Sequence, residues 1–190
     1  DPEAAPVYGS FVHSFRVGHV EGVVVEEQPF ARRRLDLKIN LHDLILDPAG
    51  AEVIGRVSGS TASVVYNLDA RRKVADLNFK GTPHFGAGQI WEIDERVLLA
   101  VPQLDQAVIT IIDMETWKTV QQIKTVGPGY FLPDDKSTKN LRFRILSGPD
   151  MNAIQLIGKQ SLKITQTNTP SPGAIPEAFP LVDGLIIHAK

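Results

Sequence analysis

Short runs of β-branched and other apolar residues, separated by polar turns, recur along most of this chain. Three clear runs are 64–68, 109–112 and 154–157, and each is followed by a turn and a second run that opens near a lysine. A run of four to eight such residues bounded by turn residues is typical of a β-strand. No segment of the sequence has a convincing helical period, so the pattern predicts an all-β protein.

The strand pattern repeats with a fixed period. Two sets of turn residues each recur at intervals of 44 or 45 residues: Asp69, Asp113 and Gly158, and Pro83, Pro128 and Pro172. A period of this length with four short strands per unit is the signature of a β-propeller. A β-sandwich with a fortuitous repeat is the alternative, but two independent markers with one period favour the propeller.

The repeat also predicts the blade boundaries. The middle unit shows its strands best, at 89–93, 96–101, 107–113 and 119–124. Nearly whole blades are expected at 41–80, 84–126 and 128–168, with incomplete blades at both ends, the last reaching 185–188. Residues 1–190 then make about four blades. Because an open propeller leaves unpaired strand edges, we expect further sequence to complete the ring.

One stretch, 81–88, holds His84 between a proline and several glycines. Imidazole can bind a metal or move a proton near neutral pH. Proline fixes the backbone before it, and glycines let a flat ligand approach the main chain. His42 lies about one blade earlier. Because the loops that enter the inner strands of a propeller ring one end of its channel, both histidines are expected at one mouth.

The same mouth is expected to carry glycines and aromatic walls. A shift of one blade maps His84 onto Gly129 and then Gly173, and maps Phe85 onto Tyr130. The candidate pocket residues are therefore His42, His84, Gly129, Gly173, Phe85, Tyr130 and Trp91. A lone histidine is usually structural or exposed to solvent, but a pair in register suits a large flat ligand with a reactive centre. Arg16 is a candidate partner for a ligand carboxylate.

Composition excludes several other classes of protein. The chain has 190 residues and a formal net charge of -2, which gives no electrostatic case for nucleic acid as a partner. It has no cysteine, which excludes disulfides, cysteine-ligated zinc, iron–sulfur clusters and a CxxCH haem attachment within it. No apolar run reaches the length that spans a membrane. The glycines of 81–88 do not form a dinucleotide fingerprint.

Several motifs resemble the haem d1 propeller, the eight-bladed domain of cytochrome cd1 nitrite reductase and its relatives. They are the stretch 81–88, the preceding 41–43, and the blade-like 112–129. Within that family, 127–132 and 152–157 are most similar to the dihydro-haem d1 dehydrogenase branch, which completes the cofactor by forming its acrylate side chain. The resemblance covers about residues 10–175.

The resemblance implies a periplasmic redox protein of denitrification that binds haem d1. By motif, His42 and His84 are similar to the two histidines over the distal face of haem d1, so His84 is the candidate distal ligand and base. No residue here matches the family's proximal iron ligand, and a c-type haem is expected only in an N-terminal domain outside this sequence. A c-type cytochrome or another periplasmic electron carrier is the expected partner, and a homodimer stays open.

Three functions follow from the resemblance. The substrate is the tetrapyrrole itself if the protein is a dehydrogenase, and nitrite if it is a nitrite reductase. Two histidines favour the reductase, whereas the loop lengths favour the dehydrogenase. A non-catalytic haem d1 carrier or interaction propeller is the alternative from a different class.

Overall fold

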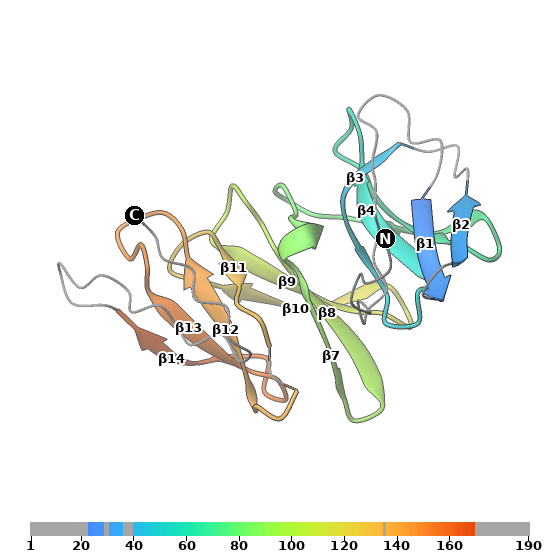
Figure 1. Cartoon of the computed structure of the whole chain (residues 1–190). Coiled ribbons are helices and arrows are strands. Elements are labelled where there is room, and N and C mark those ends of the chain that lie inside the picture. The colour runs from blue at the N-terminus through green and yellow to red at the C-terminus, as the bar shows by residue number, and fades with distance from the viewer. Residues whose placement is uncertain (1–22, 29–30, 36–39, 135, 170–190) are drawn as a thin grey trace, which may run out of the picture.

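The computed structural model describes residues 23–28, 31–35, 40–134 and 136–169 (Figure 1). Within these ranges all regular structure is β except one 3₁₀ turn, η1 (Phe85–Ala87). A two-stranded sheet of β1 (Val23–Gln28) and β2 (Ala31–Leu35) precedes three four-stranded antiparallel sheets. The predicted all-β class is therefore confirmed. No helix in the described ranges is long and apolar enough to cross a membrane.

Each four-stranded sheet is a meander, because strands consecutive in the chain are neighbours in the sheet. The first sheet contains β3 (Leu41–Leu46), β4 (Glu52–Val57), β5 (Ser63–Asn67) and β6 (Arg72–Leu77). The second contains β7 (Gln89–Ile93), β8 (Arg96–Pro102), β9 (Val108–Asp113) and β10 (Lys118–Lys124). The third contains β11 (Gly129–Phe131), β12 (Asn140–Ile145), β13 (Ile154–Gly158) and β14 (Ile164–Asn168). The strands predicted for the middle unit match β7 to β10 within one residue.

The three sheets stand side by side like the blades of a fan, with apolar side chains packed between neighbours (Figure 1). Residues of β8 serve both interfaces, since Leu99 and Val101 pack towards the first sheet and Leu98 and Ala100 towards the third. Both faces of this sheet are thus buried, and its strands read as continuous apolar runs because neither face meets water.

Exposure follows the position of a strand within its sheet. β8 and β9 in the middle of the second sheet are almost wholly buried, whereas β10 and β14 expose most of their side chains. The first strands, β3, β7 and β11, are the edge strands on one side of the three sheets, and the last strands are the edge strands on the other side. This arrangement of four-stranded blades is what the sequence period predicted. Arg16, Gly173 and the expected terminal strand at 185–188 lie outside the described residues.

Candidate functional site

The backbone register places His42 and His84 at the same position of neighbouring sheets. In each sheet a carbonyl ahead of the first strand, or of the isolated Pro83–Gln103 bridge that precedes β7, accepts a hydrogen bond from an amide just after the second strand. The acceptor is Asn40 in the first sheet and Thr82 in the second, and the distance is 2.8 Å in both. Each histidine stands two residues after that acceptor. The expected pairing of the two histidines is thus a strict structural equivalence.

In the third sheet the same position holds Tyr130. There the carbonyl of Pro128 accepts the corresponding hydrogen bond, also at 2.8 Å, and Tyr130 is two residues further on. This corrects the sequence mapping, which placed Gly129 opposite His84. The prolines used as markers do not hold equivalent positions, because Pro128 aligns with Thr82 and not with Pro83. The mapping was consequently wrong by one residue.

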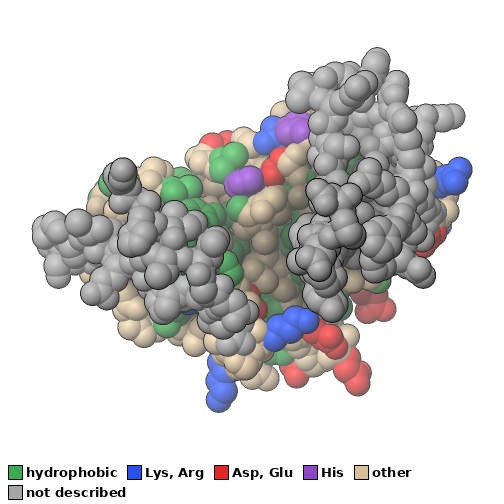
Figure 2. Space-filling model, in the orientation of Figure 1, with side chains coloured by type: hydrophobic (Ala, Val, Ile, Leu, Met, Phe, Trp, Pro, Cys, Tyr) green, Lys and Arg blue, Asp and Glu red, His purple; other side chains and the backbone are tan. Residues whose placement is uncertain are grey.

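The three equivalent side chains are partly exposed, while their neighbours are buried. In the first sheet Leu41 is 1% exposed, and in the third Phe131 is 8% exposed. The side chain of His84 is 37% exposed. Successive residues of a strand point to opposite faces, so a core residue beside each of these positions leaves it outside the core. Figure 2 shows that both described histidines reach the same surface of the molecule.

A carboxylate from the first sheet holds the loop of the second. Asp43 Oδ1 lies 2.7 Å from Nδ1 of His84 and accepts the amide of Gly86 at 2.9 Å. Its other oxygen, Oδ2, accepts the amide of Phe85 at 3.1 Å. Since a carboxylate only accepts, the Nδ1 atom of His84 is the donor in the first contact. The imidazole is therefore oriented, and its Nε2 atom is left to accept a proton or a ligand.

A β-bulge in β3 brings Asp43 to this place. The register of β3 against β4 shifts between His42 and Leu44, and Asp43 has a backbone φ of 50°. Aspartate is one of the few residues that tolerate the left-handed region, and a bulge re-aims a side chain at the edge of a sheet. Sequence reasoning noted Asp43 beside His42 but gave it no role. The available signal was an acidic residue directly after His42 and about one blade before His84.

The other histidine carries an unsatisfied atom. Nδ1 of His42 is buried and has no hydrogen-bond partner among the described residues. An unpaired buried polar atom costs about 1 to 3 kcal/mol, so such atoms usually indicate a missing partner. A polar group of a bound ligand beside His42 would fit this position.

Two aromatic residues expected in the pocket belong to the core. Phe85 is fully buried and meets Phe79 edge-on, with ring centroids 5.6 Å apart. Trp91 is 6% exposed, and its Nε1 atom donates to the carbonyl of Lys159 at 3.3 Å. Neither ring has a free face for a planar ligand, so the expectation of aromatic walls at Phe85 and Trp91 is corrected. Tyr130 is the aromatic residue at the site position.

Gly129 and Gly88 allow two backbone segments to approach each other closely. A Cβ atom on Gly129 would collide with the carbonyl oxygen of Arg144 on the neighbouring strand. A Cβ atom on Gly88 would lie 2.9 Å from the carbonyl oxygen of Phe85 and 3.1 Å from that of Ala100. The close approach that these glycines permit is therefore between backbones, and the expected role of Gly129 in admitting a ligand is corrected.

The start of the histidine loop is anchored separately. Asp105 Oδ1 accepts the amide of Thr82 at 2.7 Å, and its Oδ2 accepts the Thr82 hydroxyl at 3.1 Å. The hydrogen bond from the Thr82 amide is the main cause that lowers the pKa of Asp105 from its usual value. Asp105 thus fixes the backbone before Pro83, whereas Asp43 contacts the imidazole that follows it.

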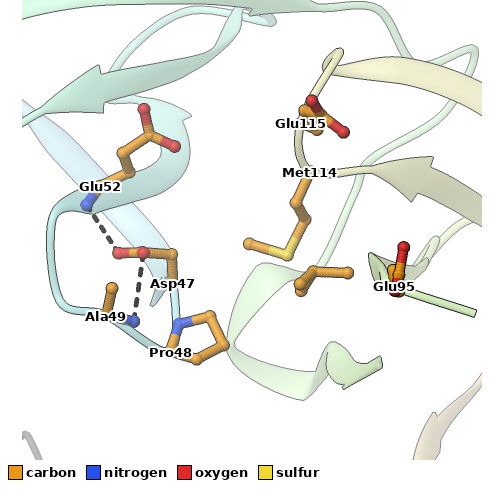
Figure 3. A pocket seen from close by; sticks show the side chains of 8 residues that line it. Asp47, Pro48, Ala49, Glu52, Glu95, Met114 and Glu115 are labelled. Carbon is orange, nitrogen blue, oxygen red and sulfur yellow. Dashed lines mark hydrogen bonds between the residues drawn. The ribbon is translucent and has the colours of Figure 1, made fainter. Parts of the chain in front are cut away.

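A hollow lies between the first and second sheets, at the end of β3 away from His42 (Figure 3). It is lined by four carboxylates and by apolar side chains: Asp47, Glu52, Glu95 and Glu115, and Pro48, Ala49, Val97 and Met114. Asp47 is occupied with its own turn, since its oxygens accept the amides of Ala49 and Glu52. Among the described residues no group of three or more histidine, cysteine, aspartate or glutamate side chains could hold a metal ion.

Three packed meander sheets with one shared register define an open segment of a β-propeller. The family model for the cytochrome D1 heme domain matches residues 13–183, and the chain belongs to this family. The resemblance to the haem d1 propeller is thereby confirmed.

The chain is similar to dihydro-heme d1 dehydrogenase in both sequence and structure. Dihydro-heme d1 dehydrogenase of Pseudomonas aeruginosa is 31% identical over 173 residues, which cover 90% of this chain and 35% of the relative. The solved structure of dihydro-heme d1 dehydrogenase NirN in complex with DHE matches with a TM-score of 0.71 and 30% identity. That match covers 81% of this chain and 34% of the other. The chain spans about a third of the length of these relatives.

Proposed function

We propose that this chain is part of a haem d1-binding oxidoreductase of the dihydro-haem d1 dehydrogenase type. The observation that carries the proposal is the contact between Asp43 and His84, which orients an imidazole at a partly exposed site position. Membership of the cytochrome D1 heme domain family supports a tetrapyrrole as the ligand. The two relatives support its dihydro form as the substrate.

The proposed reaction converts a propionate side chain into an acrylate. Two protons and two electrons leave the side chain, and a carbon–carbon double bond forms. Nε2 of His84 accepts one proton and the other passes to solvent. The tetrapyrrole supplies the path for the electrons, which leave to a c-type haem or another electron carrier. A positioned general base contributes roughly 10²- to 10⁴-fold to the rate of such a step.

The other two site positions have binding roles in this proposal. His42 would meet a polar group of the tetrapyrrole, because its buried Nδ1 atom lacks a partner in the described chain. Tyr130 would contact the same ligand from the third sheet, where it holds the equivalent position. The proximal iron ligand would come from a blade outside this chain. The protein would work in the periplasm of a denitrifying cell.

A nitrite reductase is the second candidate, and the equivalence of His42 and His84 is the observation that favours it. In that role both imidazoles would be protonated. They would hold nitrite by charge-assisted hydrogen bonds and deliver two protons, while one electron from an external donor reduces nitrite to nitric oxide and a water leaves. The relatives favour the dehydrogenase.

Purified full-length protein tests these functions. Dihydro-haem d1 is added with an electron acceptor, and the conversion of its spectrum to that of haem d1 is followed. Conversion without consumption of nitrite supports the dehydrogenase, whereas nitrite consumption with an electron donor selects the reductase. Binding without either turnover would indicate a carrier. If neither tetrapyrrole binds, the proposal is overturned and an interaction propeller remains.

A further inference from the structure

We infer that Asp43 is a positioning residue that fixes the tautomer and orientation of His84. The inference rests on the proposed function for its kinetic consequence, but the tautomer itself is a property of this chain alone. Asp43 touches no reacting atom in this scheme, because it acts through the imidazole.

The geometry allows one arrangement of protons at the contact. The Asp43 carboxylate accepts and cannot donate, and its Oδ1 lies 2.7 Å from Nδ1 of His84. The tautomer with its proton on Nε2 would place the Nδ1 lone pair against this negative oxygen. The proton therefore resides on Nδ1, and the Nε2 lone pair is available to a substrate. A hydrogen bond at one ring nitrogen of histidine usually determines whether the other nitrogen carries a proton.

Two backbone amides keep the carboxylate in this orientation. Phe85 donates to Oδ2 and Gly86 donates to Oδ1, so both oxygens are engaged and the group cannot rotate without losing a bond. The side chain of Asp43 is 14% exposed, which limits competition from water. The turn that supplies these amides is itself fixed by the fully buried ring of Phe85.

The same contact joins two blades. Asp43 belongs to the first sheet and His84 precedes the second, and the bulge that aims Asp43 lies directly after His42. Asp43 thus follows His42 directly in the chain and contacts His84 from the neighbouring sheet. A displacement of the first blade against the second would move the carboxylate and the imidazole apart, so the activity of His84 depends on their packing.

Asparagine is the informative substitution at this position. It keeps the size of aspartate but offers only one acceptor oxygen. It cannot accept from His84 Nδ1 and from the amides of Phe85 and Gly86 at the same time. In Asp43→Asn the proton of His84 is expected to redistribute towards Nε2. Loss of such a supporting partner lowers activity by about 10- to 100-fold in comparable sites, so we expect kcat to fall by this factor. We expect KM for dihydro-haem d1 to change by less than about threefold, because Asp43 does not contact the substrate.

The tautomer is measured by long-range 1H–15N spectra of full-length protein labelled at histidine, without any tetrapyrrole and on the alkaline side of the imidazole titration. His84→Gln assigns the signal. A proton on Nδ1 in the wild type that moves towards Nε2 in Asp43→Asn supports the inference. A wild-type proton on Nε2 overturns it even if the variant does not fold, and so does an unchanged tautomer in a folded variant.

Asp105→Asn is the matched control. Asp105 also accepts an amide and a side-chain donor of the histidine loop, but its partner is Thr82 and no histidine. This variant should leave the His84 tautomer unchanged. If Asp43→Asn shifts the tautomer without lowering kcat in an active protein, the positioning role is overturned. If the wild-type protein has no dehydrogenase activity, the proposed function fails while the tautomer result still stands.

Discussion

His42 and His84 hold the same register position in neighbouring sheets, two residues after equivalent backbone acceptors. The loops that lead to these positions differ, since a 3₁₀ turn follows His84 whereas a bulge follows His42. The equivalence therefore comes from the strand register. Tyr130 extends the series to the third sheet, so three adjacent blades present a polar ring side chain at one level of the edge that the first strands form.

Replacement of His84 by glutamine tests the proposed base. Glutamine keeps a polar side chain of similar length but cannot accept a proton at neutral pH. We expect turnover of dihydro-haem d1 to fall by roughly 10²- to 10⁴-fold, because a positioned general base contributes about that much. The measurement is kcat of the full-length variant, with substrate binding followed by absorbance.

His42→Gln is the paired variant, since His42 holds the equivalent position but has no carboxylate at Nδ1 in the described chain. We expect this change to weaken substrate binding more than it lowers kcat. Unchanged turnover in His84→Gln would rule out His84 as the base.

Phe85 and Tyr130 should separate core packing from ligand contact. Phe85→Leu removes part of a fully buried ring, so we expect the free energy of unfolding to fall by about 1 to 2 kcal/mol. Tetrapyrrole affinity should stay close to that of the wild type. Tyr130→Phe removes only a hydroxyl from a partly exposed side chain, so stability should change by less than about 0.5 kcal/mol while affinity or turnover falls. Urea denaturation and absorbance titrations measure the two effects, and the reverse pattern would contradict this assignment.

The strands of the middle blade were predictable because two local signals agreed. Both faces of that sheet are buried, which gives apolar runs such as 97–101, and the intervening turns are marked by polar residues. The period then fixed the blade architecture, because each unit repeats the same meander.

The site was predictable only in part. The equivalent positions of the two histidines followed from their spacing, but the mapping onto the third blade was wrong by one residue because Pro83 and Pro128 differ in register. The role of Asp43 depends on a bulge and on a contact across 41 positions, which no local pattern encodes. The burial of Phe85 and Trp91 was missed because Phe85 lies in a 3₁₀ turn and Trp91 in a first strand, and the sequence there does not say which neighbouring sheet covers the ring.

Substitution of Gly129 tests whether this residue is needed by the fold. An alanine Cβ there would collide with the carbonyl oxygen of Arg144, so the paired strands must separate. We expect Gly129→Ala to lower the free energy of unfolding by about 1 to 3 kcal/mol, as overpacking usually does. Gly86→Ala is the control. A Cβ atom on residue 86 would lie 3.3 Å from its nearest neighbour, Asp43 Oδ1, so the cost of this change should be smaller. Equal stabilities in urea denaturation would contradict the prediction.

Asp113 gives the fold a defined dependence on acid. The Thr116 amide, together with Arg96, lowers the pKa of this carboxyl in the folded protein, even though burial opposes the charge. The unfolded chain has the ordinary pKa of about 3.9. The charged contacts therefore stabilise the fold at neutral pH, and this stabilisation is lost as the pH falls below that value towards the lower folded pKa. Asp113→Asn should be less stable than the wild type by about 1.5 to 3 kcal/mol at pH 7, the range for hydrogen bonds to charged groups. In urea titrations the difference should stay constant down to about pH 5 and then shrink, whereas a difference at about pH 3 that is as large as at pH 7 would contradict this origin. Arg96→Ala should cost less than about 1 kcal/mol, because the arginine side chain is 47% exposed.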